Sequence, residues 1–372
     1  MDTTLSFDRR RADGKAPAAA PQRLQTIADD KAMLRLAAEQ SRDLHKARPE
    51  IYWPDMIASA TVGYAGLVGA ILLPTGWAIL SAVIAVLALY RAELFIHELT
   101  HMKHSTMPGF RMGWNLLVGI PLLVPSFMYE GVHNLHHART RYGTVQDPEY
   151  LPLSHMKPGS TVGFILISAL APLGLLIRFG ILAPLSLVFP KLRAHVVAAY
   201  SGLAVNPKFR RRAPEGDLRR IWHWQEAAAS IWAIALLTMV ATGVMPLRVF
   251  AILLAVSAGV AVINQVRTLA AHLWENEWDE DGEPMSVTAQ YLDSVNVPPP
   301  SLLPFLWAPV GLRYHALHHL LPSVPYHSLG EAHRRLMAAL EPDSAYHGAN
   351  HAGLSVVARR ILGNAARNSR KQ

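Results

Sequence analysis

Five long apolar runs constrain this chain more than any other feature of its sequence. They cover residues 56–73, 77–96, 160–189, 226–247 and 249–264. A helix that crosses a bilayer needs about 20 predominantly apolar residues, and these runs reach or approach that length. Buried helices of a large soluble protein are the alternative, but such helices rarely follow one another with so few charges. The runs therefore predict an all-α integral membrane protein.

The connections between the runs predict two long transmembrane hairpins, or about four crossings. Pro74-Thr75-Gly76 is too short and uncharged for a cytoplasmic loop, so the first two runs form one hairpin. Residues 226–247 and 249–264 form the second hairpin in the same way. Basic residues lie at the opposite ends of both hairpins, which the positive-inside rule places in the cytoplasm.

Two other apolar segments are not expected to cross as simple helices. Residues 113–128 contain Pro121 and Pro125 and predict a re-entrant or interfacial piece. A single crossing by residues 160–189 would place the strongly basic stretch that follows on the outer face, against the charge rule. Residues that interrupt this run, namely Pro172, Gly174, Arg178 and Pro184, instead predict a broken hairpin that dips in and returns.

Composition divides the chain into three regions and excludes several kinds of site. We expect a flexible basic arm and interfacial segment at residues 1–50, a membrane-embedded catalytic domain at 51–340 and a basic C-terminal tail at 341–372. The net charge of +8 comes from basic residues beside apolar runs, which favours anionic lipid over nucleic acid. The absence of cysteine excludes disulfides, thiolate metal sites and iron–sulfur clusters.

Three histidine clusters lie beside these runs. They are HELTHMKH with His97, His101 and His104, HNLHH with His133, His136 and His137, and HALHH with His315, His318 and His319. Histidines three and four residues apart share one face of a helix, so each cluster can converge on a metal. A lone histidine at a membrane interface is usually structural, and it is the repetition that predicts a metal centre.

Imidazole suits iron, and two irons offer up to about twelve coordination positions. The eight clustered histidines other than His104 would therefore leave room for a further ligand and for dioxygen. His272, in the stretch NQVRTLAAHLWEN, lies about two helical turns beyond the last apolar run. A helix that emerges from the membrane would carry it to the same cytoplasmic site.

Several charged residues are candidates for supporting roles. Glu93, Glu98 and Asp147 could orient ligand imidazoles through the second ring nitrogen, although each also fits a surface or turn position. Near the clusters lie three arginines that could hold a polar headgroup or anchor to lipid phosphate: Arg139, Arg141 and Arg313. Arg267, near the end of an apolar run, is expected to pair with an acidic neighbour.

The three clusters in this order, with hairpins between them, resemble the histidine-box family of membrane fatty acid desaturases and related hydroxylases over roughly residues 50–340. HALHHLLPSVPYHSLGEAHRRL is similar to the third box of bacterial acyl desaturases, and DPEY at 147–150 to the end of the second. By this resemblance the iron ligands are expected to be His97, His101, His133, His136, His137, His272, His315, His318 and His319.

The chain departs from the family pattern at two positions. Stearoyl-type members carry an asparagine four residues before the extra histidine, where this chain has Thr268, so we expect no iron contact from that position. His104 exceeds the usual pair of the first box and is expected to lie beside the ligands rather than bind metal.

The resemblance implies oxygen-dependent desaturation of a fatty acyl chain at a di-iron centre, with hydroxylation of an acyl chain or other lipid as the alternative. An unactivated methylene has no acidic proton or leaving group, so oxygen activated on a metal is required. The expected partners are a lipid or acyl-thioester substrate, membrane lipids and a separate ferredoxin or cytochrome b-type electron donor. The expected location is the bacterial inner membrane, with the active site on the cytoplasmic side.

Two other classes of function fit parts of the sequence. Residues 97–101 match H-E-x-x-H, the zinc protease helix, but a catalytic zinc needs three protein ligands and would leave seven clustered histidines without a role. A histidine-rich metal transporter would hold its ion near the bilayer midplane, whereas these clusters lie beyond the ends of the apolar runs.

Overall fold

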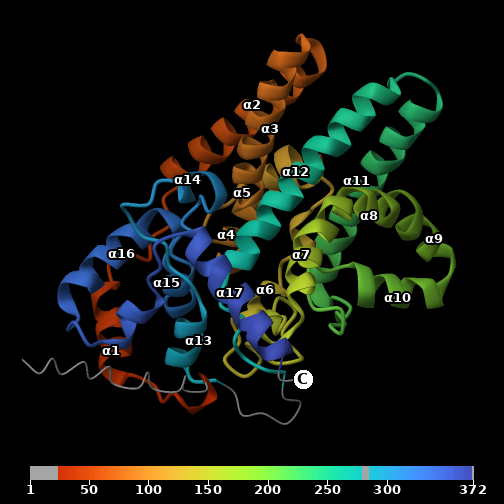
Figure 1. Ribbon diagram of the computed structural model, residues 1–372. Coiled ribbons are helices and arrows are strands. Elements are labelled where there is room, and N and C mark those ends of the chain that lie inside the picture. The colour runs from red at the N-terminus through yellow and green to blue at the C-terminus, as the bar shows by residue number, and fades with distance from the viewer. Residues whose placement is uncertain (1–23, 279–284, 371–372) are drawn as a thin grey trace, which may run out of the picture.

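The computed structural model describes residues 24–278 and 285–370. Within these ranges every regular element is a helix, which confirms the predicted all-α class. Two long hairpins project from the same side of a body of shorter helices (Figure 1). The short helices of that body are α6 (His133–His136), α13 (Val287–Asp293), α14 (Pro304–Trp307), α15 (His315–Leu320), η1 (Leu24–Thr26) and η7 (Ala345–Ala349).

The first hairpin joins α2 (Pro49–Leu72) to α3 (Thr75–Glu93), with the turn at the predicted proline. The two helices lie so close that a Cβ on Gly66 would come within 2.9 Å of the backbone of Ser81 and Ala85. After a slight break, α4 (Phe95–His101) continues α3 into the body.

The second hairpin joins α11 (Gly216–Ala241) to α12 (Leu247–Ala271). Its second helix runs seven residues past the predicted apolar run, because the polar stretch from Asn264 onward still forms helical hydrogen bonds. As a result α12 carries the chain from the tip of the hairpin directly to His272.

Five helices in the described chain are long and apolar enough to cross a membrane: Pro49–Leu72, Thr75–His101, Pro158–Val188, Gly216–Ala241 and Leu247–Ala271. Their outward faces carry exposed large apolar side chains, such as Trp77, Leu187 and Ile231, which are 65%, 79% and 69% exposed. Proteins in water rarely expose a continuous apolar surface of this kind. The protein is therefore an integral, multi-pass membrane protein.

The broken hairpin predicted within residues 160–189 is wrong. The chain stays helical through α7 (Pro158–Leu166), η5 (Ile167–Leu170), α8 (Ala171–Ile177), η6 (Arg178–Leu182) and α9 (Ala183–Val188). Pro172 and Pro184 occupy the first turns of α8 and α9, where proline suits a helix. The reversal comes at Phe189, and α10 (Pro190–Tyr200) then runs back beside α9.

A buried ion pair joins this segment to the second hairpin. Arg178 donates its Nε to the carbonyl of Tyr200 at 2.9 Å and pairs with Glu226 of α11. A second guanidinium, that of Arg193, lies 2.7 Å from the same carboxylate. Arg178, which was predicted to interrupt the apolar segment, therefore holds α10 against that segment.

Residues 113–128 do not form a crossing helix, in agreement with the prediction. They comprise the end of α5 (Phe110–Trp114), then η2 (Asn115–Gly119) and η3 (Ser126–Met128). The side chain of Asn115 bonds to both the hydroxyl and the backbone N–H of Ser126, at 2.9 and 2.8 Å. These bonds fold the segment back on itself.

The regions near the two ends are more firmly packed than predicted. In the expected interfacial segment, α1 (Lys31–Gln40) buries Met33 and Ala37 against α16 (Tyr326–Ala339). In place of a C-terminal tail, α17 (Leu354–Ser369) packs on η4 (Leu153–His155) and α12 through the fully buried Val357 and Ile361. Both helices are amphipathic and cover the body, whereas residues 1–23 of the arm and interfacial segment predicted at residues 1–50 lie outside the described chain.

Candidate metal centre

All nine histidines predicted as ligands lie together in the body, directly below the two hairpins. The elements that carry them are α4 for His97 and His101, α6 with the residue after it for His133, His136 and His137, the end of α12 for His272, and α15 for His315, His318 and His319. Their ring nitrogens form two groups, and within each group the nitrogens lie within 4.8 Å of one another. The first group is His97, His101, His133, His137 and His318; the second is His136, His272, His315 and His319.

Each H-x-x-H-H box divides between the two groups instead of converging on one metal as predicted. His133 and His137, one helical turn apart, face the first group, while His136 faces the second. The third box is divided in the opposite sense, because His315 and His319 face the second group and His318 the first. The division places the two groups side by side on the same pair of short helices.

The spacing of the imidazoles fits metal ions. Nε2 atoms of neighbouring rings lie 3.0 Å apart for His101 and His318, and 3.1 Å apart for His272 and His315. Ligands at about 2.1 Å and at right angles are separated by about 3.0 Å, whereas tetrahedral ligands are separated by about 3.4 Å. The observed separations are therefore close to those expected of imidazoles that share a metal ion. Both ring nitrogens of His97 are buried without a hydrogen-bond partner in the described chain.

Burial keeps most of these rings in the neutral form that binds metal. It lowers the pKa of His137, His315 and His319 well below the ordinary value, and the neighbouring imidazoles lower it further. For His136 burial also acts to lower the pKa, but the carboxylate of Asp147 outweighs it and the pKa is raised. The lone pairs of the neutral rings are available to a cation at neutral pH.

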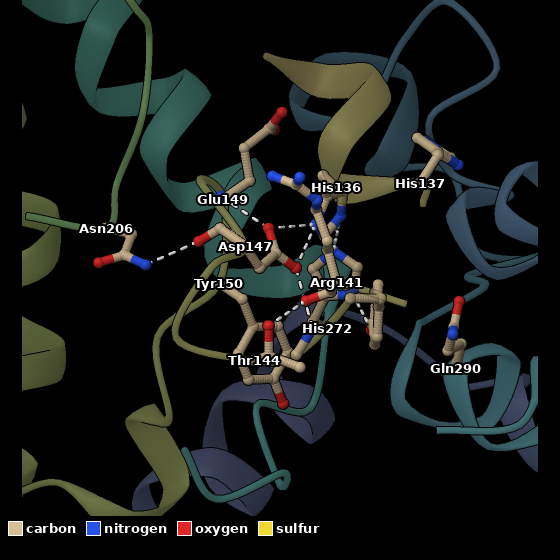
Figure 2. A network of polar contacts seen from close by, with 12 residues as sticks. His136, His137, Arg141, Thr144, Asp147, Glu149, Tyr150, Asn206, His272 and Gln290 are labelled. Carbon is tan, nitrogen blue, oxygen red and sulfur yellow. Dashed lines mark hydrogen bonds and ion pairs between the residues drawn. The ribbon is translucent and has the colours of Figure 1, made fainter. Parts of the chain in front are cut away.

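Carboxylates from the second box hold two of the ligands in place (Figure 2). Asp147 contacts Nδ1 of His136 and accepts the backbone N–H groups of Gly143 and Glu149 at 2.9 and 2.8 Å. Glu149 itself accepts from Nδ1 of His133 at 2.8 Å and from the hydroxyl of Tyr129 at 2.7 Å. The sequence analysis singled out Asp147 but missed Glu149, although both belong to the DPEY motif.

A third ligand is held through a tyrosine that the sequence analysis also missed. The hydroxyl of Tyr142 lies 2.8 Å from Nδ1 of His272 and donates to the carboxylate of Asp293 at 3.0 Å. Asp293 also accepts from the hydroxyl of Tyr150 at 2.8 Å. Tyr142 lies five residues after His137, and because it is uncharged it did not stand out in the sequence as Asp147 did.

The other predicted supporting residues make no hydrogen bond to the histidines of the two groups in the described chain. One oxygen of Glu98 accepts from the hydroxyl of Tyr52 at 2.5 Å and from the backbone N–H of Tyr326 at 3.1 Å, while the other lies 3.8 Å from Nδ1 of His97. Glu93 makes no hydrogen bond to a histidine in the described chain. Because α4 ends at His101, His104 leaves the predicted helix face, and its half-exposed ring points instead to Glu130, 3.8 Å away.

Sequence comparison decides the family. The profile of the family described as "Fatty acid desaturase" matches residues 73–350. This chain belongs to the fatty acid desaturase family. A protein of Caulobacter vibrioides (strain NA1000 / CB15N) described as "Ceramide hydroxylase" is 48% identical over 328 residues, which cover 88% of this chain and 92% of that protein.

This member of the fatty acid desaturase family is therefore an oxidoreductase that acts on lipids, and its family is one of histidine-ligated di-iron oxidases. The membership argues against the zinc protease and the transporter.

Two cavities adjoin the metal centre of this desaturase-family protein. The basic cavity, of about 670 Å³, reaches His101 and is lined by Lys103, Arg141 and Arg210 among others. The membrane-side cavity, of about 380 Å³, reaches His97 and lies between α12, η5 and α8. A cavity between lipid-facing helices that ends at the histidines matches the dry channel expected for a lipid chain.

The predicted headgroup arginines have separate positions. Arg139 is exposed and pairs with Asp29 at 3.1 Å, and Arg313 donates to the backbone carbonyls of Val297 and Ser301. Of the three, Arg141 alone lines one of the two cavities. The expectation that Arg267 pairs with an acid is wrong: no carboxylate of the described chain lies within 4 Å of it, because α3 and α4 place Glu93 and Glu98 too far away.

Proposed function

We propose that this protein is a di-iron lipid hydroxylase that acts on a ceramide-like lipid, with the nine histidines of the two groups as iron ligands. The observation that carries the proposal is the convergence of nine imidazoles, from segments up to 222 residues apart, at spacings that fit metal ligation. The 48% identity to a protein described as a ceramide hydroxylase favours hydroxylation over desaturation.

The proposed reaction inserts one oxygen atom of O2 into a C–H bond of the lipid, and the other atom leaves as water. Two electrons and two protons complete the balance, and the electrons come from a separate one-electron carrier protein of the ferredoxin or cytochrome b type. When bound, the two irons supply the activation of O2 that no side chain can provide. The substrate enters from the bilayer, and we place the histidines on the cytoplasmic side of the bacterial inner membrane.

The residues of the chain have three tasks in this reaction. Asp147, Glu149 and Tyr142 accept or relay the Nδ1 protons of ligand imidazoles, which fixes the rings and makes them better ligands. The apolar walls of the membrane-side cavity hold the chain of the lipid and exclude water. We assign these tasks to a catalytic domain at residues 51–340, on which α1 and α17 are packed.

The test is expression of the full chain in a host that makes ceramide, followed by mass spectrometry of total lipid. The expected product is a ceramide one oxygen atom heavier, formed only with iron, O2 and a reductant. A ceramide or acyl chain two hydrogen atoms lighter would show desaturation instead. Unchanged lipids from a protein that carries two irons would contradict the proposal.

A further inference from the structure

The membrane-side cavity is lined by a buried cation, Arg267, that forms no ion pair with a carboxylate of the described chain. Arg267 is 7% exposed and lines this cavity together with His97. Its Nη2 donates to Asn264 at 3.3 Å, but its Nε has no hydrogen-bond partner in the described chain. A buried charge without a counter-charge is costly, so folded proteins usually provide one. Arg267 also lines the membrane-side cavity, a space that a ligand can fill.

The polar groups of the cavity are concentrated at the end nearest the histidines. Asn264, Arg267 and Thr268 lie within two turns of His272 on α12. Farther along the same helix the cavity is lined by Val260 and Ala261 and, about 16 Å from Thr268, by Ser257. The opposite wall, from η5 and α8, is mainly apolar, with Ile167, Ala171 and Leu175. The cavity thus has a polar metal end and an apolar far end.

The polar end offers both donors and acceptors. Arg267 supplies N–H groups, and the carboxyl of Glu93 and the amides of Asn264 and Gln265 supply oxygen atoms. A neutral head that contains an amide and hydroxyl groups can match both sets. A carboxylate head could bind Arg267 but would meet the oxygen atoms of Glu93 in the same cavity.

We propose that Arg267 binds the amide carbonyl or a hydroxyl oxygen of a ceramide-like lipid, so that the hydroxylated carbon lies only a few bonds from the polar head. This inference rests on the proposed hydroxylase function. The tail of the lipid then occupies the apolar far end of the cavity. The reaction keeps the balance given above: one oxygen atom of O2 enters the C–H bond, the other leaves as water, and a carrier protein supplies two electrons.

The position of the new hydroxyl is the first test. Iron-loaded wild-type protein in vesicles is given a ceramide with a defined saturated acyl chain, a reductant and O2, and the product is analysed by tandem mass spectrometry. The expected hydroxyl lies on a carbon next to, or a few carbons from, the amide group. A hydroxyl or double bond in the middle of either chain would overturn the inference. No oxidised lipid at all would instead contradict the proposed function.

Equilibrium binding is the second test and needs no turnover. A fluorescent ceramide is titrated into vesicles that contain the anaerobic wild type, Arg267→Gln or the exposed control Arg139→Gln. A hydrogen bond to a charged group predicts a Kd about ten- to a hundredfold weaker for Arg267→Gln and an unchanged Kd for the control. An unchanged Kd for Arg267→Gln would overturn the inference.

Further variants and ligands distinguish the proposal from misfolding of the variant, from a carboxylate ligand and from binding in the basic cavity. If Arg267→Gln fails to fold, Arg267→Lys keeps the charge and is expected to weaken binding less than tenfold while it preserves the position of the hydroxyl. Weaker binding of a free fatty acid but not of ceramide by an Arg267 variant would assign the site to a carboxylate and overturn the proposal. The proposal would also be overturned if Arg141→Gln, in the basic cavity, weakens ceramide binding and Arg267→Gln does not.

Discussion

Both carboxylate oxygens of Asp147 lie within hydrogen-bond distance of Nδ1 of His136, at 3.0 and 2.9 Å. This contact fixes the ring with Nε2 toward the other histidines of its group, where Nε2 of His272 lies 3.2 Å away. A buried carboxylate in this position raises the basicity of a ligand imidazole and sets which nitrogen carries the proton.

We predict that Asp147→Asn lowers iron affinity or turnover by about ten- to a hundredfold, because the amide cannot stabilise the ring as the carboxylate does. Iron per chain after dialysis and the rate of lipid oxidation are the measurements. Asp217→Asn is the matched control, since Asp217 is 92% exposed on α11 and pairs only with Arg220 in the described chain. Full iron content and full activity for Asp147→Asn would refute this role.

Removal of a single imidazole should have a larger effect. His318→Ala and His136→Ala take one nitrogen from the first and second group respectively, and we predict that both abolish product and lower bound iron. His347→Ala and His351→Ala should do neither, because those rings lie outside both groups. Equal activity of all four variants would contradict the ligand assignment.

Tyr142→Phe tests the relay between His272 and Asp293. Loss of the hydroxyl leaves Nδ1 of His272 with Ser294 at 3.2 Å as its remaining neighbour, and Asp293 keeps the hydroxyl of Tyr150. We predict a roughly tenfold loss of iron affinity with little loss of folded protein. Tyr64→Phe removes a hydroxyl bonded to the carbonyl of Leu117, away from the histidines, and should leave iron binding unchanged.

Glu98→Gln separates an oxidase from a zinc protease. The glutamine can still accept from Tyr52 and Tyr326, and it touches no ligand nitrogen at hydrogen-bond distance. We therefore predict that lipid oxidation and iron content stay within about twofold of wild type, a range that corresponds to less than about 0.5 kcal/mol. Complete inactivation with intact iron binding would show that this carboxylate takes part in the reaction.

Glu226→Gln tests the packing of the segment that differed most from prediction. The change leaves Arg178 and Arg193 near each other without a counter-charge, and breaking a buried pair costs about 3–5 kcal/mol of unfolding free energy. Thermal unfolding in detergent should shift to lower temperature, while iron per folded chain stays constant. An unchanged unfolding temperature would show that the pair is not needed for stability.

Sequence reasoning succeeded where one strong pattern dominates. Apolar length located both hairpins, and the repeated histidine boxes located the nine imidazoles, including His272 outside any box. It failed where contacts between distant segments determine the course of a helix or the direction of a side chain. A proline in the first turn of a helix looks the same in sequence as one that breaks it, and Pro172 proved to be the former. The distribution of each box over two groups depends on how α6 and α15 face each other, which no local pattern contains.

The partners of the ligands were harder to predict than the ligands themselves. Asp147 and Glu149 are two residues apart, yet they serve different histidines because the backbone turns between them. Asp293 and Tyr142 are separated by 151 residues and meet only in the folded protein. Arg267 had been assigned an acidic neighbour because burial of a charge usually requires one, but the structure pairs it with the neutral side chain of Asn264 beside the membrane-side cavity.

The four histidines of the second group come from α6, the end of α12 and α15, which the ribosome makes in that order. The number of imidazoles available to a metal ion therefore depends on how much of the chain has been made. Neither coordination set is complete until the ribosome has added His318 and His319, long after both hairpins have been made. A nascent chain therefore offers incoming iron only partial sets of imidazoles. On the proposed ligand assignment, metal loading can be completed only after α15 has been made, and a translation product that stops before α15 would lack the third histidine cluster.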